Sequence, residues 1–444
     1  MAKRLLKGGR VVDPAAGRDG ELDVLMEDGR ITAVGRDLPL SDGAQVIQVP
    51  RGFVIVPGLI DMHVHLREPG QEHKETIATG VRSAVAGGFT AVACMPNTSP
   101  VNDNAGVTSF ILAKAREAGL ARVYPIGAVT RGSAGEQLAD IAELHAAGCV
   151  AITDDGHPVA TSLIMRRALE YTRMFDLPVI DHCEDQSLKG DGVAHEGVYA
   201  AALGLRGIPG AAEEIMVARD VTLAGMTGGH VHIAHMSARG SLDAVRVGKT
   251  RGAHVTCEVA PHHFTLTDES LERPLKYDTN CKMNPPLRDA ADVEVMIEGI
   301  RDGSVDVIAT DHAPHHADEK NVEFDRAPFG IVGLETCVPL VFDRLVHRGV
   351  ITLTRFVELL SLNPARILRR EGGTLAAGAV ADITVLAPDA CVTIRGASLR
   401  SKSKNTPFDG WELRGAAAAT IIGGRTVFVN DAVAGAEAFG WDGV

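Results

Sequence analysis

Hydrophobic and polar residues follow one pattern at the ends of this chain and another in its middle. At both ends, short apolar runs are separated by Gly and Asp turns, a pattern typical of β-strands. The runs are Leu5–Val12, Leu22–Glu27, Ile31–Val34 and Val46–Gln48 near the start, and Ile383–Leu386, Val392–Ile394, Thr420–Ile422 and Thr426–Val429 near the end. Residues 8–12 (GGRVV) and 423–427 (GGRTV) also resemble each other. We therefore predict that both termini build one small β domain that flanks an inserted core.

Between these ends, apolar β-type runs alternate with segments that have a helical pattern. In residues 75–86, Ile77, Val81 and Val85 recur at every fourth position and two glycines follow, as expected of an amphipathic helix and its end. Residues 161–175 show a similar pattern after a Thr-Ser start that can cap a helix. The apolar runs are Phe53–Met62, Ala91–Met95, Arg122–Ala128, Val150–Thr153, Pro178–His182, His230–His235, His254–Val259 and Val305–Thr310.

These eight runs and the segments between them predict a (β/α)8 barrel of the TIM type. Strands this apolar fit a parallel sheet that helices cover on the outside. The predicted fold class is therefore α/β, with a barrel and a small β-sandwich domain formed by both termini. We expect residues 1–56 and 373–444 to form the two parts of the small domain and residues 57–372 to form the catalytic barrel.

The composition and the net charge limit which kinds of molecule the protein can bind. The chain has 444 residues, of which 45% are hydrophobic and 4% aromatic, and its formal net charge is −13. This apolar content is sufficient for a large buried core. The negative net charge argues against a nucleic acid or an anionic membrane as a partner. Local cations must therefore hold any anionic ligand.

The cysteines and the N-terminal segment indicate in which cellular compartment the protein resides. Seven cysteines are scattered along the chain without a CxxC pair, as is typical of core residues in a reducing compartment. The first residues are basic but lack the apolar core of a secretion signal. We also find no run of about 18 apolar residues that could span a membrane. We therefore expect a cytoplasmic protein.

Side chains with metal-binding chemistry stand at the carboxyl ends of the predicted barrel strands, where such barrels carry their catalytic residues. His63 and His65 are two residues apart, so on a strand they point to the same face. The other polar residues at strand ends are Asn97, Asp154 and Asp155, His182, His235, and Asp311. Four imidazoles and two carboxylates are too many ligands for one tetrahedral zinc ion, but they suit two ions that share a carboxylate. The residues alone leave open which of Asp154 and Asp155 is the ligand.

Such a centre predicts hydrolysis of an amide-like bond. Two metal ions ~3.5–4 Å apart can share a water, lower its pKa and polarise a carbonyl group. A carboxylate beside them can take the proton of the water and pass it to the leaving nitrogen.

Several motifs carry a resemblance to a known family. They are DMHVHLREPG (61–70), MPNT (95–98), TDDG (153–156), DHCED (181–185), HIAHMS (232–237), KMNPPLR (282–288), ATDHAPH (309–315) and PFGIVGLET (328–336). On these motifs the chain resembles the amidohydrolase superfamily, and more closely the bacterial class I dihydroorotases that have an aspartate on the fourth strand. The resemblance implies a zinc enzyme that interconverts dihydroorotate and N-carbamoyl-L-aspartate in pyrimidine biosynthesis.

The resemblance also implies a role for each ligand. The expected ligands are His63, His65 and Asp311 for one Zn²⁺ and His182 and His235 for a second, with Asp155 as the bridge. Two zinc ions per chain are therefore expected, with Asp311 as the general acid and base. In hydantoinases the bridge is a carboxylated lysine, whereas residues 149–155 (CVAITDD) contain no lysine.

Charge suggests how the substrate is recognised. Dihydroorotate carries a carboxylate, which the planar guanidinium of arginine binds with two hydrogen bonds. Arg67 lies two residues after His65; its alternative role is a surface ion pair with Glu68 or Glu72. The resemblance adds Asn97 and His315 on the same carboxylate, Asn284, Phe329 and Gly330 on the pyrimidine ring, and His65 and Leu66 as further contacts.

Some residues close to these motifs are interpreted as structural. They are His312 and the pair His262-His263. Asp181 should point away from the site, because side chains alternate along a strand and His182 points toward it. Residues 313–328 are polar and charged between two apolar elements. We expect them to form a mobile loop over the site.

Two other functions stay open at this point. One is an allantoinase or hydantoinase with the same chemistry, against which Arg67 and the aspartate of the fourth strand argue. The other is a non-catalytic scaffold for aspartate carbamoyltransferase, although this chain keeps all six ligands. The expected partners are a small-molecule substrate, a second copy of the chain in a homodimer, and an aspartate carbamoyltransferase in a complex worth testing. No nucleic acid and no membrane is expected.

Overall fold

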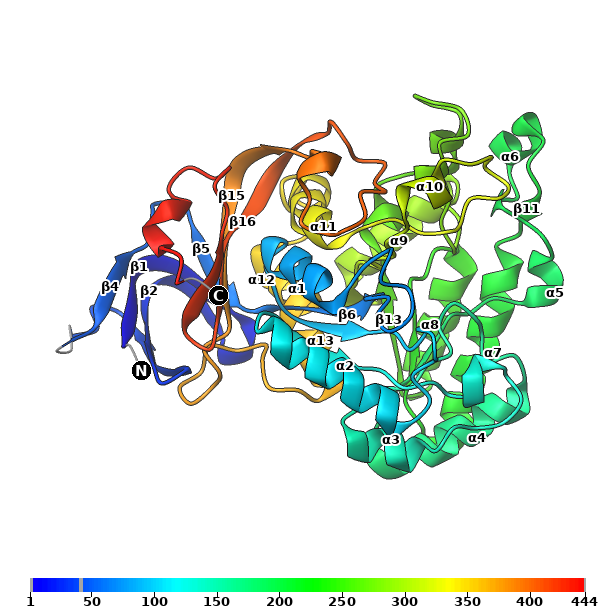
Figure 1. Cartoon of the computed structure of the whole chain (residues 1–444), viewed down its shortest axis with the longest axis horizontal. Helices are drawn as coiled ribbons and strands as arrows, with labels where there is room; N and C mark the ends of the chain where they lie inside the picture. Colours follow the sequence, from blue (N-terminus) through cyan, green and yellow to red (C-terminus); the bar gives the residue numbers. More distant parts are fainter. Residues whose placement is uncertain (1–2, 40–42, 443–444) are drawn as a thin grey trace.

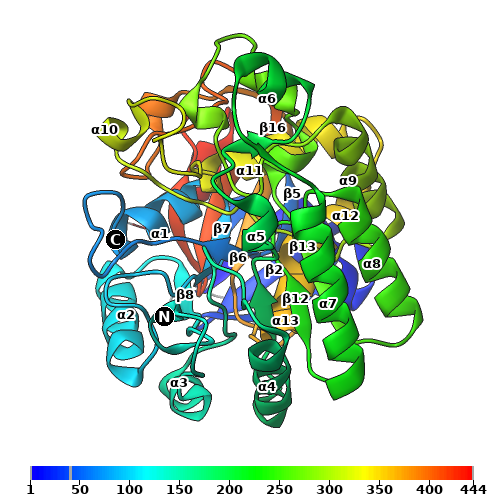
Figure 2. The ribbon, with the colours of Figure 1, turned by 90° about the vertical axis from the view of Figure 1, so that its right-hand side faces the viewer.

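The computed structural model describes residues 3–39 and 43–442. It consists of a mixed β-sheet on one side, where the first and last strands of the chain meet, and a helix-rich part on the other side (Figure 1). In the helix-rich part, strands lie in the middle and helices surround them (Figure 2). Residues 1–2, 40–42 and 443–444, which fall within the predicted small β domain, lie outside the described residues.

The mixed sheet is built from both ends of the chain. Its strands are β1 (Arg4–Asp13), β2 (Arg18–Glu27), β3 (Arg30–Gly35), β4 (Gln45–Gln48), β5 (Val54–Pro57), β15 (Ile383–Thr393), β16 (Glu412–Ile422) and β17 (Arg425–Val429). Their order is β17-β16-β15-β5-β1-β2-β3, and β4 pairs with β1. β5 joins the two halves, because it pairs in parallel with β1 and antiparallel with β15.

Hydrogen bonds join all of these strands into one sheet, so the two layers expected of a sandwich are two parts of a single curled sheet. The curling brings the turn after β2 close to the turn after β16. Ala381 bonds to both turns: its N–H donates to Gly29 O (2.8 Å), and its carbonyl accepts from Gly424 N (2.9 Å). Apolar side chains from both parts, such as Leu6 and Ile421, are buried in one cluster.

Two C-terminal strands differ from the prediction. Residues 383–386 and 392–394 were expected as separate strands, but residues 383–393 form one strand, β15. Its register shifts between Ala387 and Cys391, and such a bulge accommodates the intervening proline that made the sequence look interrupted. β16 begins at Glu412 and not at Thr420. The prediction missed its first half because the run Ala416–Ala419 has low β-propensity. In the structure this run is buried, and β16 packs against α11 (Leu334–Val341).

The helix-rich part contains the parallel strands. They are β6 (Leu59–Val64), β7 (Phe89–Cys94), β8 (Arg122–Pro125), β9 (Val179–Asp181), β12 (Val231–Ile233), β13 (Val255–Val259) and β14 (Val307–Ile308). A further short pair, β10 (Ala194–His195) and β11 (Gly207–Ile208), lies outside this set. The α/β class predicted from the sequence is confirmed.

Parallel pairing leads from each of these strands to the next and back to the first. Ladders connect β6 to β7 to β8, and β9 to β12 to β13 to β14. The run predicted as a strand at 150–153 makes only single parallel bridges, from Ile152 to Gly127 and to Val179. A parallel bridge between Val64 and His312 returns from the end of β14 to β6.

The helices follow the parallel strands along the chain. They are α1 (Ile77–Ala86), α2 (Ala105–Ala118), α3 (Ile141–Ala147), α4 (Ser162–Thr172), α5 (Gln186–Lys189), α6 (Val198–Leu203), α7 (Ala211–Thr227), α8 (Arg239–Thr250), α9 (Ala290–Asp302), α10 (Ala317–Lys320), α11, α12 (Leu353–Val357) and α13 (Asn363–Leu368). In the part of the chain that the structure describes, none of them is long and apolar enough to cross a membrane.

Side-chain capping sets where the two predicted helices begin. The Thr76 side chain accepts a hydrogen bond from Thr79 N at the start of α1, and the Thr161 side chain accepts one from Ile164 N at the start of α4. Both caps satisfy backbone N–H groups that have no partner inside the helix. α1 ends at Ala86, with Gly87 as its C-cap, while the last residues predicted for α4, 173–175, form a 3₁₀ turn.

Two apolar clusters of the helix-rich part meet at β6. The larger one lies between helices and strands and includes Leu59 and Val64 of β6. The smaller one gathers side chains from successive parallel segments, among them Ile60, Ala93 and Ile180. β6 thus contributes to both clusters, which fixes the segment that carries His63.

We expect Gly415→Ala to lower the free energy of unfolding by about 3 kcal/mol, through overpacking and backbone strain. Gly415 has φ +108°, and an added Cβ would lie 2.3 Å from Cβ of Phe342, a fully buried residue. Urea unfolding measures the change. Gly410→Ala is the matched control, because Gly410 has φ +81° but no atom within 4 Å of the added Cβ. Equal losses in both variants would mean that the contact with Phe342 is unimportant.

Candidate metal centre

The side chains predicted to bind metal converge at the carboxyl ends of the parallel segments. His63 lies in β6 with His65 just beyond it, and His182 and His235 lie just beyond β9 and β12. Asp155 follows the bridge at Ile152, and Asp311 follows β14. All six are buried. The structure therefore brings the six residues to one place from five segments that are far apart in the sequence.

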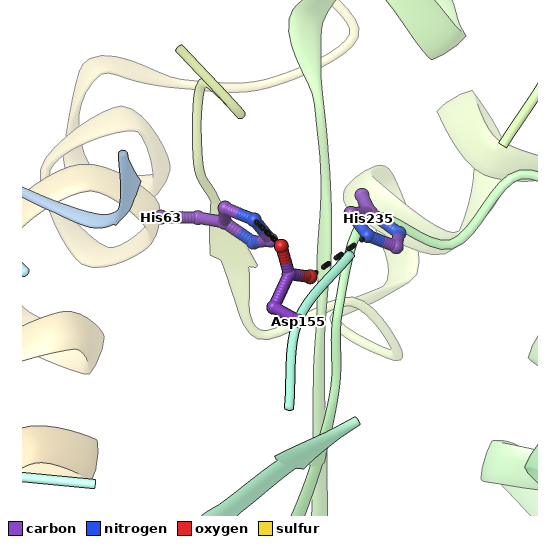
Figure 3. Close-up of side chains that lie close together, drawn as sticks. All are labelled: His63, Asp155 and His235. Carbon is purple, nitrogen blue, oxygen red and sulfur yellow. Dashed lines mark ion pairs between the residues drawn. The ribbon is translucent and has the colours of Figure 1, made fainter. Parts of the chain in front are cut away.

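The carboxylate of Asp155 lies between two pairs of imidazoles. Its Oδ2 is 3.5 Å from Nε2 of His63 and 3.6 Å from Nε2 of His65. Its Oδ1 is 3.5 Å from Nε2 of His235 and 3.8 Å from Nδ1 of His182. Figure 3 shows this carboxylate between His63 and His235. One oxygen faces each pair, which is the geometry that a carboxylate shared by two cations requires.

Asp311 completes the first of these pairs. Its Oδ1 lies 3.1 Å from Nε2 of His65 and 3.5 Å from Nε2 of His63. On the other side, His182 and His235 face each other, with 2.9 Å between Nδ1 and Nε2. Ligand atoms of His63, His65 and Asp311 lie within 4.8 Å of one another, as do those of His63, Asp155 and His235.

Unsatisfied polar atoms test whether these residues fit a cation. Nε2 of His63 and Oδ1 of Asp155 are buried and have no hydrogen-bond partner among the described residues. Such atoms are costly when nothing binds them. Imidazole nitrogens and carboxylate oxygens are the ligands that Zn²⁺ takes in proteins. A metal pair would satisfy both atoms, so the donor set fits.

The electrostatics of the site also favour cations. Burial raises the pKa of Asp155, but the surrounding histidines, His63 above all, hold it well below its usual range. Burial likewise opposes ionisation of Asp311, yet His65 and His63 lower its pKa. For His63, burial lowers the pKa, while Asp155 and Glu258 raise it well above the usual value. Positive charge beside both carboxylates therefore favours their ionised forms.

Hydrogen bonds to the outer ring nitrogens orient the first two histidines. Nδ1 of His63 lies 2.7 Å from Oε1 of Glu258, and Nδ1 of His65 lies 2.9 Å from Oδ1 of Asn97. Each bond leaves Nε2 directed to the centre, as is usual for metal-binding histidines. The other oxygen of Glu258 lies 3.1 Å from Nε2 of His232. Glu258 was not among the residues predicted from the sequence. A buried carboxylate inside the apolar strand β13 is nevertheless unusual, and it is a signal for a residue that orients a histidine.

The structure separates the neighbouring aspartates of the fourth segment. Asp154 turns to Thr130, from which it accepts a backbone hydrogen bond at 3.0 Å and one from the hydroxyl group. Asp155 alone faces the histidines. Asp181 also points elsewhere, because it accepts from Val159 N (2.9 Å) and lies 3.4 Å from the guanidinium of Arg219.

The histidines interpreted as structural have other partners. His312 accepts a hydrogen bond from Gly333 N (3.1 Å) and lies 3.4 Å from Glu75. His263 donates to Pro285 O (2.9 Å). His262 is buried beside it.

The cationic group predicted to bind a carboxylate is buried at the edge of the centre. Arg67 Nε donates to Pro314 O (3.2 Å), and Nη2 lies 3.4 Å from Nε2 of His315. Burial lowers the pKa of Arg67 to about 10, so the guanidinium stays charged at neutral pH. No ion pair of Arg67 with Glu68 or Glu72 is seen within the described residues. Arg67 and His315 therefore lie together, as expected of two groups that share one ligand.

The remaining residues predicted to bind substrate lie around the same centre. Asn284 Nδ2 is 3.1 Å from Nε2 of His182, and its Oδ1 is buried without a hydrogen-bond partner in the described chain. Phe329 O accepts from His315 Nε2 (2.7 Å), and Gly330 N donates to Lys282 O (2.9 Å). The Leu66 side chain packs against Gly80 of α1. A contact from Leu66 to a ligand would therefore use its backbone.

Three residues of the site have left-handed backbone conformations that side chains rarely adopt. They are Arg67 (φ +62°), His235 (φ +30°) and Asp311 (φ +48°). Each such residue costs on the order of 1–3 kcal/mol, and residues of this kind concentrate at functional sites.

Residues 313–328 form a folded connection over this region. They contain the short helix α10, and the buried Lys320 donates from Nζ to Pro328 O (2.9 Å) and Gly330 O (3.0 Å). The expected mobility of this loop stays a prediction.

Known proteins with similar sequences point to one family. Residues 52–241 match a family model described as "Dihydro-orotase-like". A dihydroorotase of Geobacter metallireducens is 54% identical over 424 residues, which cover 96% of this chain and 99% of the relative. One from Pelotomaculum thermopropionicum is 56% identical over 425 residues, which cover 96% and 98%.

Solved structures with a similar fold include two hydantoinases. The L-hydantoinase (dihydropyrimidinase) of Arthrobacter aurescens superposes with a TM-score of 0.84 at 23% identity, covering 96% of both chains. A D-hydantoinase (dihydropyrimidinase) from Thermus sp. gives 0.81 at 25% identity, covering 97% of this chain and 96% of its own. The similarity extends over both regions of the molecule.

We expect Asp155→Asn to remove most of the bound metal, because it takes away the charge between the two pairs of imidazoles. Asp154→Asn should keep the metal and lose only stability, since Asp154 bonds to Thr130. Metal analysis of both purified variants measures the difference. Equal metal loss in both variants would contradict the role of Asp155.

Proposed function

The chain belongs to the dihydroorotase family, and on that premise we propose that its buried cluster binds two zinc ions and opens the ring of dihydroorotate. As a dihydroorotase, it is a cyclic amidohydrolase of pyrimidine biosynthesis, and the reaction interconverts (S)-dihydroorotate and N-carbamoyl-L-aspartate. The observation that carries the two-metal proposal is the Asp155 carboxylate, whose two oxygens face different pairs of histidines.

We assign the chain to the bacterial class I type, with a (β/α)8 barrel over residues 57–372 and a small domain from residues 1–56 and 373–444. The return of parallel pairing from His312 to Val64 supports a closed barrel. The presence of Asp155 in place of a lysine supports the subtype.

The proposed ligands are His63, His65 and Asp311 for one zinc ion and His182 and His235 for the other, with Asp155 between them. Bound there, the two ions would supply a water of lowered pKa and polarise the amide carbonyl. Glu258 and Asn97 hold His63 and His65 in the orientation that this requires.

We propose that Asp311 moves the proton of the reaction. Its carboxylate is ionised and lies beside His65, so it can accept a proton from the attacking water. The water oxygen bonds to the amide carbon, the ring C–N bond breaks, and Asp311 returns the proton to the leaving nitrogen. In ring closure the same carboxylate takes the proton from the ureido nitrogen.

Recognition of the substrate rests on its carboxylate. We propose that Arg67 binds this group, together with His315 and the amide nitrogen of Asn97, whose oxygen already faces His65. His65 and the backbone of Leu66 would add contacts. The residues proposed to contact the pyrimidine ring are Asn284, Phe329 and Gly330. Asn284 lies beside His182, and Phe329 O accepts a hydrogen bond from His315.

Homodimer formation and a complex with aspartate carbamoyltransferase stay predictions from the family resemblance. A cytoplasmic location stays a prediction from the cysteines and the N-terminal segment. Arg67 supplies local positive charge for a small anionic substrate, although the net charge of the chain is −13.

The test of the proposal is turnover of dihydroorotate by zinc-loaded protein, with zinc per chain measured on the same sample. We expect turnover in both directions with close to two zinc ions per chain, and loss of activity on chelation. Activity on hydantoins without activity on dihydroorotate would overturn the substrate assignment. Full turnover with a single ion would overturn the two-metal centre.

We expect Arg67→Lys to raise KM for dihydroorotate by about tenfold or more and to leave the zinc content unchanged. Lysine keeps the charge but loses the planar pair of hydrogen bonds to a carboxylate. Steady-state kinetics and metal analysis measure the two effects. Arg122→Lys is the matched control, because Arg122 makes a two-pronged pair with Asp382, outside the centre. An unchanged KM in Arg67→Lys would remove this residue from the substrate site.

A further inference from the structure

We propose that Asn405, a residue outside the ring of parallel strands, is a positioning residue for the substrate site. It holds His315 and Gly330 in place through its carboxamide. The proposal deepens the assigned activity and rests on the proposed substrate contacts of these two residues. Asn405 lies in the connection between β15 and β16, which extends from the mixed sheet over α11 (Figure 1).

The side chain of Asn405 uses its donor and acceptor groups on two different parts of the site. Oδ1 accepts a hydrogen bond from His315 N (3.1 Å). Nδ2 donates to Ala313 O (3.2 Å) and to Gly330 O (3.1 Å). The backbone carbonyl accepts from Val332 N (3.0 Å). One residue therefore ties the segment after β14 to the segment that follows the loop 313–328.

These bonds are buried. Asn405 is 7% exposed and His315 is 5% exposed, so water cannot readily replace the lost partner when either is changed. Among the side chains, only an amide offers an acceptor and two N–H donors in one plane. An aspartate at this position could still accept a hydrogen bond from His315 N. It would have no N–H to donate to the carbonyl oxygens of Ala313 and Gly330.

The residues just before Asn405 fasten the same connection to the first βα-loop. Ser401 Oγ donates to Glu75 Oε2, and Lys402 N donates to Glu75 Oε1 (3.1 Å). Ser403 Oγ donates to Lys74 O (2.6 Å). The loop that carries Arg67 and the loop that carries His315 are thus both attached to one short segment. Within that segment, Asn405 is the residue that reaches the predicted substrate contacts.

This arrangement separates substrate binding from metal binding. Among the described residues, Asn405 forms no hydrogen bond with any of the six proposed metal ligands. Removing its carboxamide should therefore loosen His315 and Gly330 while the centre keeps its ions. Small displacements of groups that position a substrate carry large kinetic effects.

The first measurement is the kinetics of Asn405→Ala. We expect KM for dihydroorotate to rise about tenfold, with kcat within about twofold of the original and zinc content unchanged. In a His315→Ala background the same change should raise KM only about twofold, because coupled residues do not act additively. An unchanged KM in the single variant, or fully additive effects in the double variant, would overturn the inference.

Hydrogen exchange supplies a readout that does not depend on the substrate. Asn405→Ala should exchange faster at the amides of Ala313, His315 and residues 330–332 than the original protein does. Asn405→Asp keeps the acceptor for His315 N, so it should speed exchange at 330–332 and spare His315. Unchanged exchange at both segments would refute the positioning role even if the protein acted on another substrate.

Asn430→Ala is the matched control. Asn430 also donates from Nδ2 to a backbone carbonyl, Ala417 O (3.0 Å), and accepts from Ala432 N (3.1 Å), but in the mixed sheet. It should lower Tm and leave KM unchanged. A rise of KM in this control equal to that in Asn405→Ala would reduce the role of Asn405 to general stability. If the original protein turns over no dihydroorotate, the assigned activity fails, and hydrogen exchange alone decides on Asn405.

Discussion

The carboxylate of Asp155 imposes the condition that the rest of the site has to meet. An ionised group with no access to water is expensive to bury, and it is retained only where opposite charge or a metal compensates it. Here four imidazoles converge on the two oxygens of one side chain. Such convergence needs several backbone segments that end at the same level. A set of parallel strands provides this, because their carboxyl ends lie together although their positions in the sequence do not.

The site also requires residues that orient the histidine rings. A histidine ring can rotate and can carry its proton on either nitrogen, so its position on a strand does not by itself direct Nε2 inward. Glu258 and Asn97 remove that freedom for His63 and His65. His235 and Asp311 have positive φ angles, a backbone conformation that costs stability and is concentrated at functional sites. Catalytic geometry is thus fixed by groups that need not touch a substrate.

Much of this architecture could be predicted from the sequence, because periodicity and strand ends are local signals. The apolar runs located the parallel segments, and the histidines that terminate them are the ones the structure brings together. What the sequence could not show was non-local. The proline inside β15 looked like a break because nothing in the sequence reveals a bulge opposite β16. Glu258 was not recognised, since its role depends on His63, which is distant along the chain. The carboxamide of Asn405 carries no motif of its own.

The way β5 continues into β6 has a consequence for how the molecule becomes complete. Only Gly58 separates the last residue of the mixed-sheet strand from the strand that carries His63, and Gly58 N donates to Asp382 O at 2.9 Å. All six proposed metal ligands precede residue 312, but β15, which covers the edge of β5, begins at Ile383. During synthesis of the chain, all six of these residues are therefore present before β15 is made. Until then, the uncovered edge of β5 can pair with other strands. β15 therefore protects the edge of β5, the strand that leads directly into the one that carries His63.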